Sequence, residues 1–318
     1  MHRARGFSLP EVMTALSLGL VLLAAFLVVL QRCRASFAAT ESLARLQDSA
    51  RHALSVLLPD IEHAGFYGFT NLPDTQLVGA LPAGIHVCGT NFATTLDLPA
   101  QASNDTFRLG DDARDCSPTA SAGGARAGAD TLTLRHASQD TAAPHAGRLQ
   151  VYSRALAALG PLQLFADGRA PGPIDARHEV RDLEVRSYYI ANNSVERPEW
   201  PALRVKSLTE SRGAAQFRDE EILPGVEDLQ VEIGVSDPAA DGAQHVRYVA
   251  PDDPRARARR VIAVRLWLRI RADATEPGFE DGRTLEYSDV SFTPSPLEAK
   301  QRRMLVERTV ALRNARPP

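Results

Sequence analysis

The strongest constraint on the fold is an uninterrupted apolar run near the N-terminus. From Val12 to Leu30 every residue is apolar or small and uncharged, close to the ~20 residues that a helix needs to cross a hydrocarbon core of about 30 Å. A cleaved secretory signal has a shorter apolar core of roughly 7 to 15 residues. A soluble core helix would show polar positions at helical spacing, and there are none between Ser17 and Gln31. The run therefore predicts a membrane-spanning helix.

A glutamate, Glu11, stands at the start of this run. The sequence "SLPE" fits a capping box, in which Ser8 caps the helix and Glu11, the third helical residue, reaches back to the Ser8 backbone N–H. A charged side chain deep in a bilayer costs roughly 2.5 to 3.5 kcal/mol or more, so Glu11 in lipid would need a cationic partner. The two interpretations are compatible, because one places the side chain and the other concerns its use.

The first residues resemble the class III signal of type IV prepilins and type II secretion pseudopilins. Gly6 is followed by Phe7, Glu11 is the fifth residue after the glycine, and the apolar run follows. In that family a prepilin peptidase cuts after the glycine and methylates the new N-terminal amine. The resemblance thus implies cleavage between Gly6 and Phe7, N-methylation of Phe7, and attraction of Glu11 to the N-terminal amine of a neighbouring subunit. Pro10 would become the fourth residue of the cut chain, where a missing N–H is harmless.

Beyond Arg34 the apolar residues keep a helical spacing, which predicts that the helix leaves the membrane and packs on a folded head. The stripe consists of Leu43, Leu46, Ala50, Ala53, Leu57 and Ile61. Pro59 interrupts it, so we expect a kink there, or a new helix that begins at this proline and ends near Gly65.

The end of this stem carries a more specific resemblance. "RLQDSARHALSVLLPDIEHAGFYGF" is similar to the stem of the PilW family of minor pilins, and the matching residues are Asp60, Ile61, Ala64, Gly65, Phe66 and Gly68. A cysteine often follows that last glycine in the family, whereas this chain has Phe69. Later segments, among them "GADTLTLRHAS", "ILPGVEDLQVEIGV" and "VIAVRLWLRIRA", resemble PilW blocks in the same order. The resemblance spans most of the chain and is weakest over residues 70–128.

After residue 69 the sequence predicts loops and then strands. In "VIAVRLWLRIR" the residues Ile262, Val264, Leu266, Leu268 and Ile270 share one face, and the alternation predicts a half-buried antiparallel strand. We therefore expect an α+β fold, in which a long membrane-spanning pilin helix packs on an antiparallel β-rich globular head. The expected division is a leader peptide at 1–6, the transmembrane half of the helix at 7–34, its amphipathic half at 35–69, and a periplasmic head of one or two subdomains at 70–318.

Cysteine and arginine are the two residue types whose positions could carry a special role. Of the 3 cysteines, Cys88 and Cys116 lie in loop-like sequence, so a single disulfide between them is open to the chain in an oxidising compartment. An arginine-rich stretch could hold DNA or an acidic partner, but we favour the solvated face of an amphipathic strand, because alternating exposed charge needs no ligand. Its members are Arg255, Arg257, Arg259, Arg260, Arg265, Arg269 and Arg271. With 36 basic and 39 acidic side chains, no overall field favours nucleic acid, and we do not expect DNA binding.

No motif indicates catalysis. The chain has no HExxH, no GxSxG and no Gly-rich phosphate loop. We therefore expect no enzyme, no metal and no cofactor.

The resemblance implies a structural minor pilin of a type IV pilus, part of the tip or priming complex that initiates assembly. Its partners would be the prepilin peptidase, other minor pilins, the major pilin and a large tip adhesin of the PilY1 type. It would cross the inner membrane once, with a periplasmic head, and then enter the fibre near its tip. The alternatives are a minor pseudopilin of type II secretion (J type) and a DNA-binding uptake pilin, for which the arginines are the only support.

Overall fold

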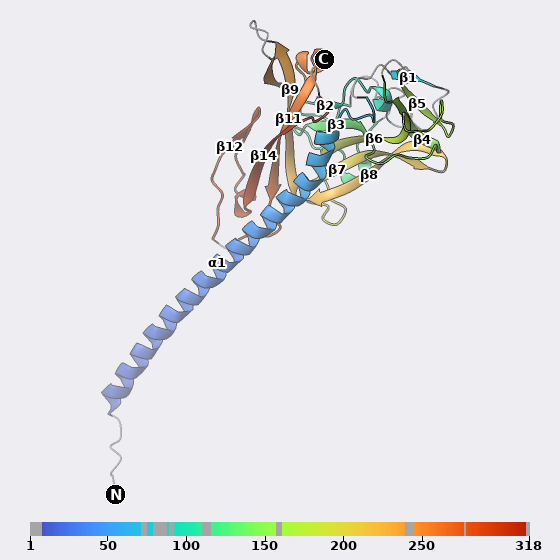
Figure 1. Ribbon diagram of the computed structural model, residues 1–318. Helices are drawn as coiled ribbons and strands as arrows, with labels where there is room; N and C mark the ends of the chain where they lie inside the picture. Colours follow the sequence, from blue (N-terminus) through green and yellow to red (C-terminus); the bar gives the residue numbers. More distant parts are fainter. Residues whose placement is uncertain are drawn as a thin grey trace.

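A single long helix on a β-rich head gives the molecule its shape (Figure 1). The computed structural model describes residues 8–70, 75–78, 88, 92–109, 116–156, 161–238, 244–276 and 278–315. The helix, α1 (Leu9–His63), has 55 residues and is about 80 Å long at 1.5 Å per residue. Its C-terminal end lies against the head and its N-terminal half projects from it. This arrangement confirms the expected fold class of a long helix followed by an antiparallel β-rich head.

The second half of α1 packs on the head through the expected stripe, with one exception. Leu46, Ala50, Ala53 and Ile61 are buried, whereas Leu43 is 41 % exposed and the neighbouring Ser42 is buried in its place. Successive residues of a helix are turned by about 100°, so the buried row that begins at Leu46 continues backward through residue 42. The assignment of Leu43 to the buried face was wrong.

α1 runs through Pro59 and ends at His63. The expectation of a new helix starting at Pro59 was therefore wrong, and residues 64–69 form the turn into the head rather than helix. A proline inside a helix removes one backbone hydrogen bond and crowds the preceding turn. Here Leu57, Asp60 and Ile61, on both sides of the proline, are buried by the head. This tertiary packing holds the last turns in helical conformation.

The larger sheet has eight strands, and its central strand is β6 (His178–Ala191). β3 (Thr131–Ala137) pairs with one edge of β6. β4 (Ala146–Arg154) and β7 (Ala202–Ser211) share the other edge, β4 pairing with residues 178–182 and β7 with residues 186–191. The remaining strands are β1 (Thr75–Leu77), β2 (Ala100–Ser103), β5 (Leu162–Asp167) and β8 (Ala214–Pro224). All pairs are antiparallel except β1 with β5.

The smaller sheet has four antiparallel strands in the order β10–β9–β11–β14. They are β9 (Val226–Pro238), β10 (Gln244–Val249), β11 (Val261–Arg271) and β14 (Arg303–Ala311). A short hairpin of β12 (Leu285–Tyr287) and β13 (Val290–Phe292) lies beside it. One-turn helices complete the head: α2 (Arg255–Ala258) and the 3-10 turns Phe92–Thr94, Ala120–Ala122 and Glu298–Lys300.

The main core joins α1 to the inner face of the smaller sheet and to β3, β6 and β7. On β11, Val264, Leu266, Leu268 and Ile270 enter this core, as the alternation predicts. The assignment of Ile262 to the same face was wrong, because the register shifts between Val261 and Ala263 and Val261 enters the core instead. The opposite face of β11 is also covered, since Trp267 is 6 % exposed and Arg269 is 5 % exposed. The β12–β13 hairpin covers it, with the Phe292 ring 3.6 Å from the Arg269 guanidinium. The expectation of a half-buried strand was therefore wrong for this face.

Replacement of Leu57 by alanine tests the docking of α1. Leu57 is fully buried, and removing a buried leucine side chain costs about 2 to 5 kcal/mol. We expect Leu57→Ala to lower the thermal unfolding midpoint of the detergent-solubilised chain by several degrees. Leu43→Ala is the matched control on the same helix and should change stability by no more than about 0.5 kcal/mol. Equal effects of the two substitutions would contradict the docking described here.

Candidate functional site

Glu11 forms a cap on the first turn of α1. The Ser8 backbone N–H donates to Glu11 Oε2 at 2.9 Å, and the Ser8 hydroxyl donates to the same oxygen at 2.8 Å. Pro10 lies in this first turn, where helical N–H groups have no partner in any case. Within the described residues Glu11 Oε1 accepts no hydrogen bond, so one carboxylate oxygen stays available. Gly6 and Phe7 lie outside the described residues, and their roles stay predictions.

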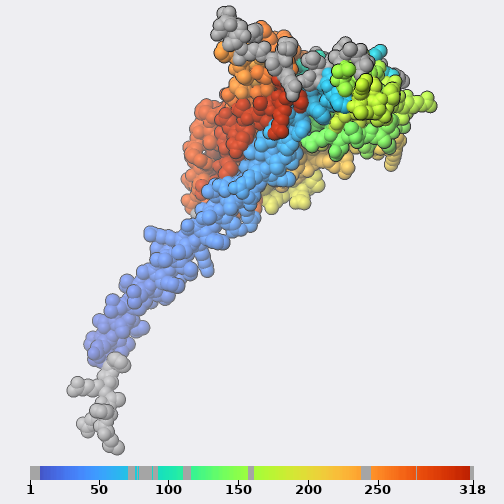
Figure 2. All heavy atoms as spheres, in the orientation of Figure 1, coloured from blue at the N-terminus to red at the C-terminus, as the bar shows by residue number. Residues whose placement is uncertain are grey.

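The half of α1 that follows Glu11 is apolar and uncovered. Figure 2 shows it standing clear of the head. It is the one helix in the described part of the chain that is long and apolar enough to cross a membrane, and none of its most apolar window is buried. Exposed large side chains include Leu16, Leu20, Leu23, Phe26 and Val29. In water such a surface would be strongly unfavourable, which indicates that lipid or other subunits cover it.

A buried carboxylate joins the other end of α1 to the larger sheet. Asp60 is 5 % exposed, and Arg186 of β6 donates to its Oδ1 at 2.6 Å. The Tyr188 hydroxyl donates to Oδ2. His136 Nε2 of β3 lies 3.7 Å from Oδ1, beyond hydrogen-bond distance, so it acts through its charge. A buried carboxylate needs such partners because an unpaired one is very costly.

These contacts decide the protonation states of Asp60 and His136. Burial by itself raises the pKa of Asp60, but His136, Arg186 and the Tyr188 hydroxyl outweigh it and hold the pKa below its ordinary value. Burial lowers the pKa of His136, but Asp60 and the Ala137 carbonyl outweigh it and raise the pKa above its ordinary value. Both groups are therefore favoured in their charged forms in the folded state.

The glycines after Asp60 make the sharp turn into the head. Gly65 has a φ of +81° and its N–H donates to the Arg135 carbonyl at 3.0 Å. Gly68 has a φ of +83°, and a Cβ there would lie 2.3 Å from Glu179 Oε1. Both positions therefore require glycine. The segment Asp60–Gly68 is therefore the joint between helix and sheet. Its partners Arg186, Tyr188 and His136 carry no sequence signal of this role.

Arg135 is a second buried group that the sequence does not reveal. It is fully buried and donates to the Phe92 carbonyl at 3.0 Å, the Leu98 carbonyl at 2.8 Å and Gln101 Oε1 at 3.1 Å. Burial lowers its pKa to about 10. Arg135 therefore fixes the segment 92–101 over β3.

The structure joins Cys88 and Cys116 in a disulfide, the pairing that the sequence left open. Cys88 is buried in the core on the far side of the larger sheet, and Cys116 packs against the same core. Cys33 on α1 is exposed and has no disulfide partner.

The arginine-rich stretch does not form one continuous surface. Arg269 is buried and bonds Glu227 Oε2 at 3.2 Å. Arg265 stacks 3.9 Å from the Tyr248 ring and pairs with Glu232 at 3.3 Å. The favoured interpretation, a solvated face, was wrong for Arg269. Since these guanidinium groups already bind carboxylates and aromatic rings, they are poorly placed to bind a DNA backbone.

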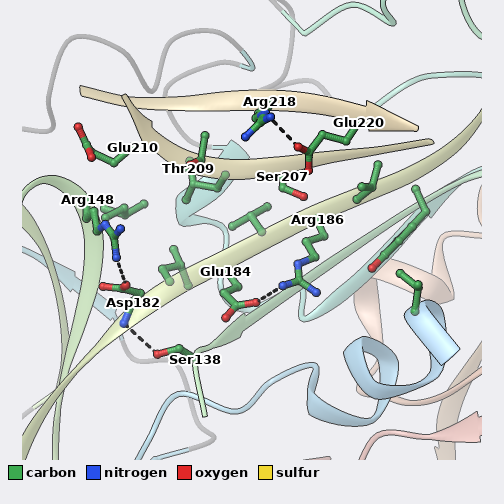
Figure 3. Close-up of a pocket in the computed structure, with 17 residues that line it drawn as sticks. Ser138, Arg148, Asp182, Glu184, Arg186, Ser207, Thr209, Glu210, Arg218 and Glu220 are labelled. Atoms are coloured by element: carbon green, nitrogen blue, oxygen red, sulfur yellow. Dashed lines mark hydrogen bonds and ion pairs between the residues drawn. The ribbon is translucent and has the colours of Figure 1, made fainter. Parts of the chain in front are cut away.

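A groove of about 460 Å³ lies on the larger sheet beside α1 (Figure 3). Three ion pairs line it, each drawn as a dashed line in the figure: Arg148 with Asp182 at 2.7 Å, Arg186 with Glu184 at 2.6 Å, and Arg218 with Glu220 at 3.0 Å. Each arginine of the groove is paired with an acid of the groove, and the one remaining acid, Glu210, accepts a hydrogen bond from the Gly213 N–H at 2.7 Å. The groove therefore has no unpaired arginine to bind an anionic ligand. Nor does any group of three or more His, Cys, Asp or Glu side chains that could hold a metal occur in the described ranges.

Two family models match this chain, one in its C-terminal part and one at its N-terminus. The family model of the type IV pilus-assembly protein W, PilW, matches residues 187–314, from β6 to just beyond β14. The prokaryotic N-terminal methylation motif matches residues 1–27. Among solved structures, a type IV-like pilin from Thermus thermophilus is similar at 13 % identity and a TM-score of 0.36, over 85 % of this chain and 98 % of that chain. A search of curated proteins finds no significant match.

Asp60→Asn tests the joint through its pH dependence. The lowered pKa of Asp60 gives stability that is present above its unfolded-state pKa of about 3.9 and lost as the pH falls through the folded-state pKa. The raised pKa of His136 gives stability that is present below about 6.5 and lost as the pH rises through its folded-state pKa. At neutral pH the variant should lose about 1 to 3 kcal/mol, because the buried Asp60 position loses its charge-assisted bonds, whereas Arg186 is 35 % exposed and keeps Glu184 as a partner.

The measurement is the unfolding midpoint in non-ionic detergent from about pH 3 to about pH 9, which brackets both groups. The natural chain should lose stability on both sides, and Asp60→Asn should flatten both limbs. Asp48→Asn, at an exposed position of the same helix, is the control and should leave the profile unchanged. A variant profile parallel to that of the natural chain would contradict the joint.

A thiol count tests the disulfide. Under denaturing conditions without reductant, we expect one maleimide adduct, on Cys33, and three adducts after reduction. The Cys33→Ser variant should give no adduct before reduction and two adducts after it. Intact mass spectrometry reads the count directly, and three adducts before reduction would show that Cys88 and Cys116 are not bridged.

Proposed function

We propose that this chain, which the PilW family model matches over residues 187–314 and the N-terminal methylation motif over residues 1–27, is a structural minor pilin that helps to initiate pilus assembly at the fibre tip. The observation that carries the proposal is the uncovered apolar half of α1 with Glu11 at its first turn. We propose that lipid surrounds this segment in the membrane and that the helices of other subunits surround it in the fibre.

Glu11 supplies the chemistry of assembly in this proposal. Its carboxylate enters an apolar environment, where an unpaired charge is costly. Ser8 binds Oε2 and leaves Oε1 without a partner among the described residues. The ammonium group at the cut N-terminus of a neighbouring subunit would remove this cost. Ser8 and Glu11 both follow the expected cleavage site, so the cap survives processing.

The architecture supports a structural role near the tip. The head consists of two sheets that bury a continuous core with α1, a larger body than a repeating fibre subunit needs. The arginines of the groove are paired with its acids, and the described residues hold no cluster of three or more His, Cys, Asp or Glu side chains that could bind a metal. We therefore assign the head to contacts with other proteins.

The proposed location and partners follow from the same features. The chain is a membrane-anchored pilus component, and we propose that it crosses the inner membrane once with its head in the periplasm. An oxidising periplasm suits the Cys88–Cys116 disulfide. The proposed partners are the prepilin peptidase, other minor pilins, the major pilin and a tip adhesin.

Intact mass with and without the prepilin peptidase tests the processing step. We expect a peptidase-dependent loss of residues 1–6 and the mass of one added methyl group on Phe7. An uncut chain in cells that contain the peptidase would overturn the proposal. Detection of the processed chain in sheared surface pili would separate a pilus role from one in type II secretion.

Two substitutions at Glu11 separate its charge from its cap. Glu11→Ala removes both, whereas Glu11→Gln keeps an oxygen that can accept the Ser8 hydrogen bonds. If the charge drives assembly, both variants should be cut normally and enter fibres at least about tenfold less, since tenfold corresponds to only 1.4 kcal/mol. Glu41→Ala, at an exposed position of the same helix, is the control. Normal assembly of Glu11→Gln would mean that Glu11 serves only as a cap.

A further inference from the structure

A cavity of about 300 Å³ lies where α1 ends, at the opposite end of the helix from Glu11. Its floor is apolar and is formed by Ala64, Leu96, Pro99, Val261, Leu312 and Ala315. Gly65 keeps it open, because a Cβ at that position would lie 3.3 Å from the Pro99 Cβ. Arg259 and Arg260 line the rim, together with one acid, Asp97.

The two rim arginines have no partner in the described part of the chain. Arg255, just before them, is bound by Asp253 at 2.6 Å. Asp237, whose pKa Arg247 and more weakly Arg259 hold below its ordinary value, is bound by Arg247 at 2.5 Å. No described carboxylate comes within ion-pair distance of Arg259 or Arg260. These two differ in this respect from the arginines of the groove in Figure 3, each of which is paired.

The backbone that carries the two arginines is held in place. The Arg259 N–H donates to the Arg255 carbonyl at 2.9 Å, and the Arg260 carbonyl accepts from the Ser236 N–H at 2.9 Å. Val261, the next residue, pairs with Val235 of β9. Two guanidinium groups are therefore carried on a fixed backbone beside an apolar cavity, so binding of a ligand has to order the arginine side chains and not the backbone.

This combination selects a particular chemistry. Guanidinium groups bind carboxylates with two parallel hydrogen bonds, and an apolar floor accepts an aliphatic side chain. A volume of about 300 Å³ is at the small end of ligand sites, which suits a few side chains. Nucleic acid would need a longer run of unpaired cations, and the pairing of Arg265 and Arg269 breaks that run.

We propose that this cavity binds a short acidic segment of a partner protein, with one or more carboxylates on Arg259 and Arg260 and an apolar side chain on the floor. The binding chemistry stands on the cavity alone. We further propose that the partner is the pilus component next to the head on the side away from the membrane. This second step rests on the proposed function, because it requires the apolar half of α1 to lie in the membrane.

Site-specific photocrosslinking in the native host tests the proposal with the full chain. p-Benzoylphenylalanine replaces Ala315 on the cavity wall, and mass spectrometry sequences the cross-linked segment. We expect a segment with at least two carboxylates next to an aliphatic residue. The double variant Arg259→Glu, Arg260→Glu should lower the cross-link yield at least tenfold. Arginine in place of the acids of the identified segment should then restore the yield.

The matched control is Arg169→Glu with Arg177→Glu, two exposed arginines elsewhere on the head, and it should leave the yield unchanged. Thermal unfolding checks that the variants fold, and Arg259→Gln with Arg260→Gln replaces the double reversal if that variant is unstable. A processed, fibre-incorporated chain without a cross-link, a cross-link to a basic segment, or one insensitive to the arginines would overturn the proposal. An uncut chain would instead overturn the proposed function, while the cross-link still reports the cavity's occupant.

Discussion

The ion pair between Asp60 and Arg186 connects the two parts of this molecule. It lies where the last turns of α1 cross the larger sheet, with the Asp60 carboxylate buried beside His136 and Tyr188 and the Arg186 side chain reaching it from the groove. The glycine turn at residues 65 and 68 and the continuation of the helix through Pro59 both place Asp60 at this point. Helix and head therefore form one body, and the direction in which the helix leaves the head is fixed.

Two carboxylates of α1, Asp60 and Glu11, differ in where their partners come from. Asp60 is buried and has a cation and a hydroxyl within its own chain. Glu11 has only Ser8, a neutral donor, in the described part of the chain. A carboxylate whose partners are internal stabilises a fold, whereas one that lacks a cation stabilises an assembly when a second chain supplies it. The same side-chain chemistry thus serves folding at one end of the helix and association at the other.

Periodic features of the head and stem could be read from the sequence, and contacts between distant segments could not. The inner face of β11 follows from strict alternation, and Leu46, Ala53 and Ile61 follow from helical spacing. The burial of Arg269 was missed because it depends on a hairpin some twenty residues further along the chain. A new helix at Pro59, one of the two expected outcomes, does not form, because packing of Leu57 and Ile61 overrides the local preference for a break. Arg135 was missed for a similar reason, since its acceptors are carbonyl groups of a loop.

The length of α1 has a mechanical consequence. Residues 9–39 project as an arm of about 45 Å, and residues 42–61 are held by the head over about 30 Å. A sideways force on the free end therefore acts on the head with leverage, and the contacts at the two ends of the held segment, near Ser42 and Ile61, carry opposing loads. A pull along the axis has no such leverage and is shared by the whole apolar stripe. The protein is thus built to withstand tension along its stalk far better than bending across it.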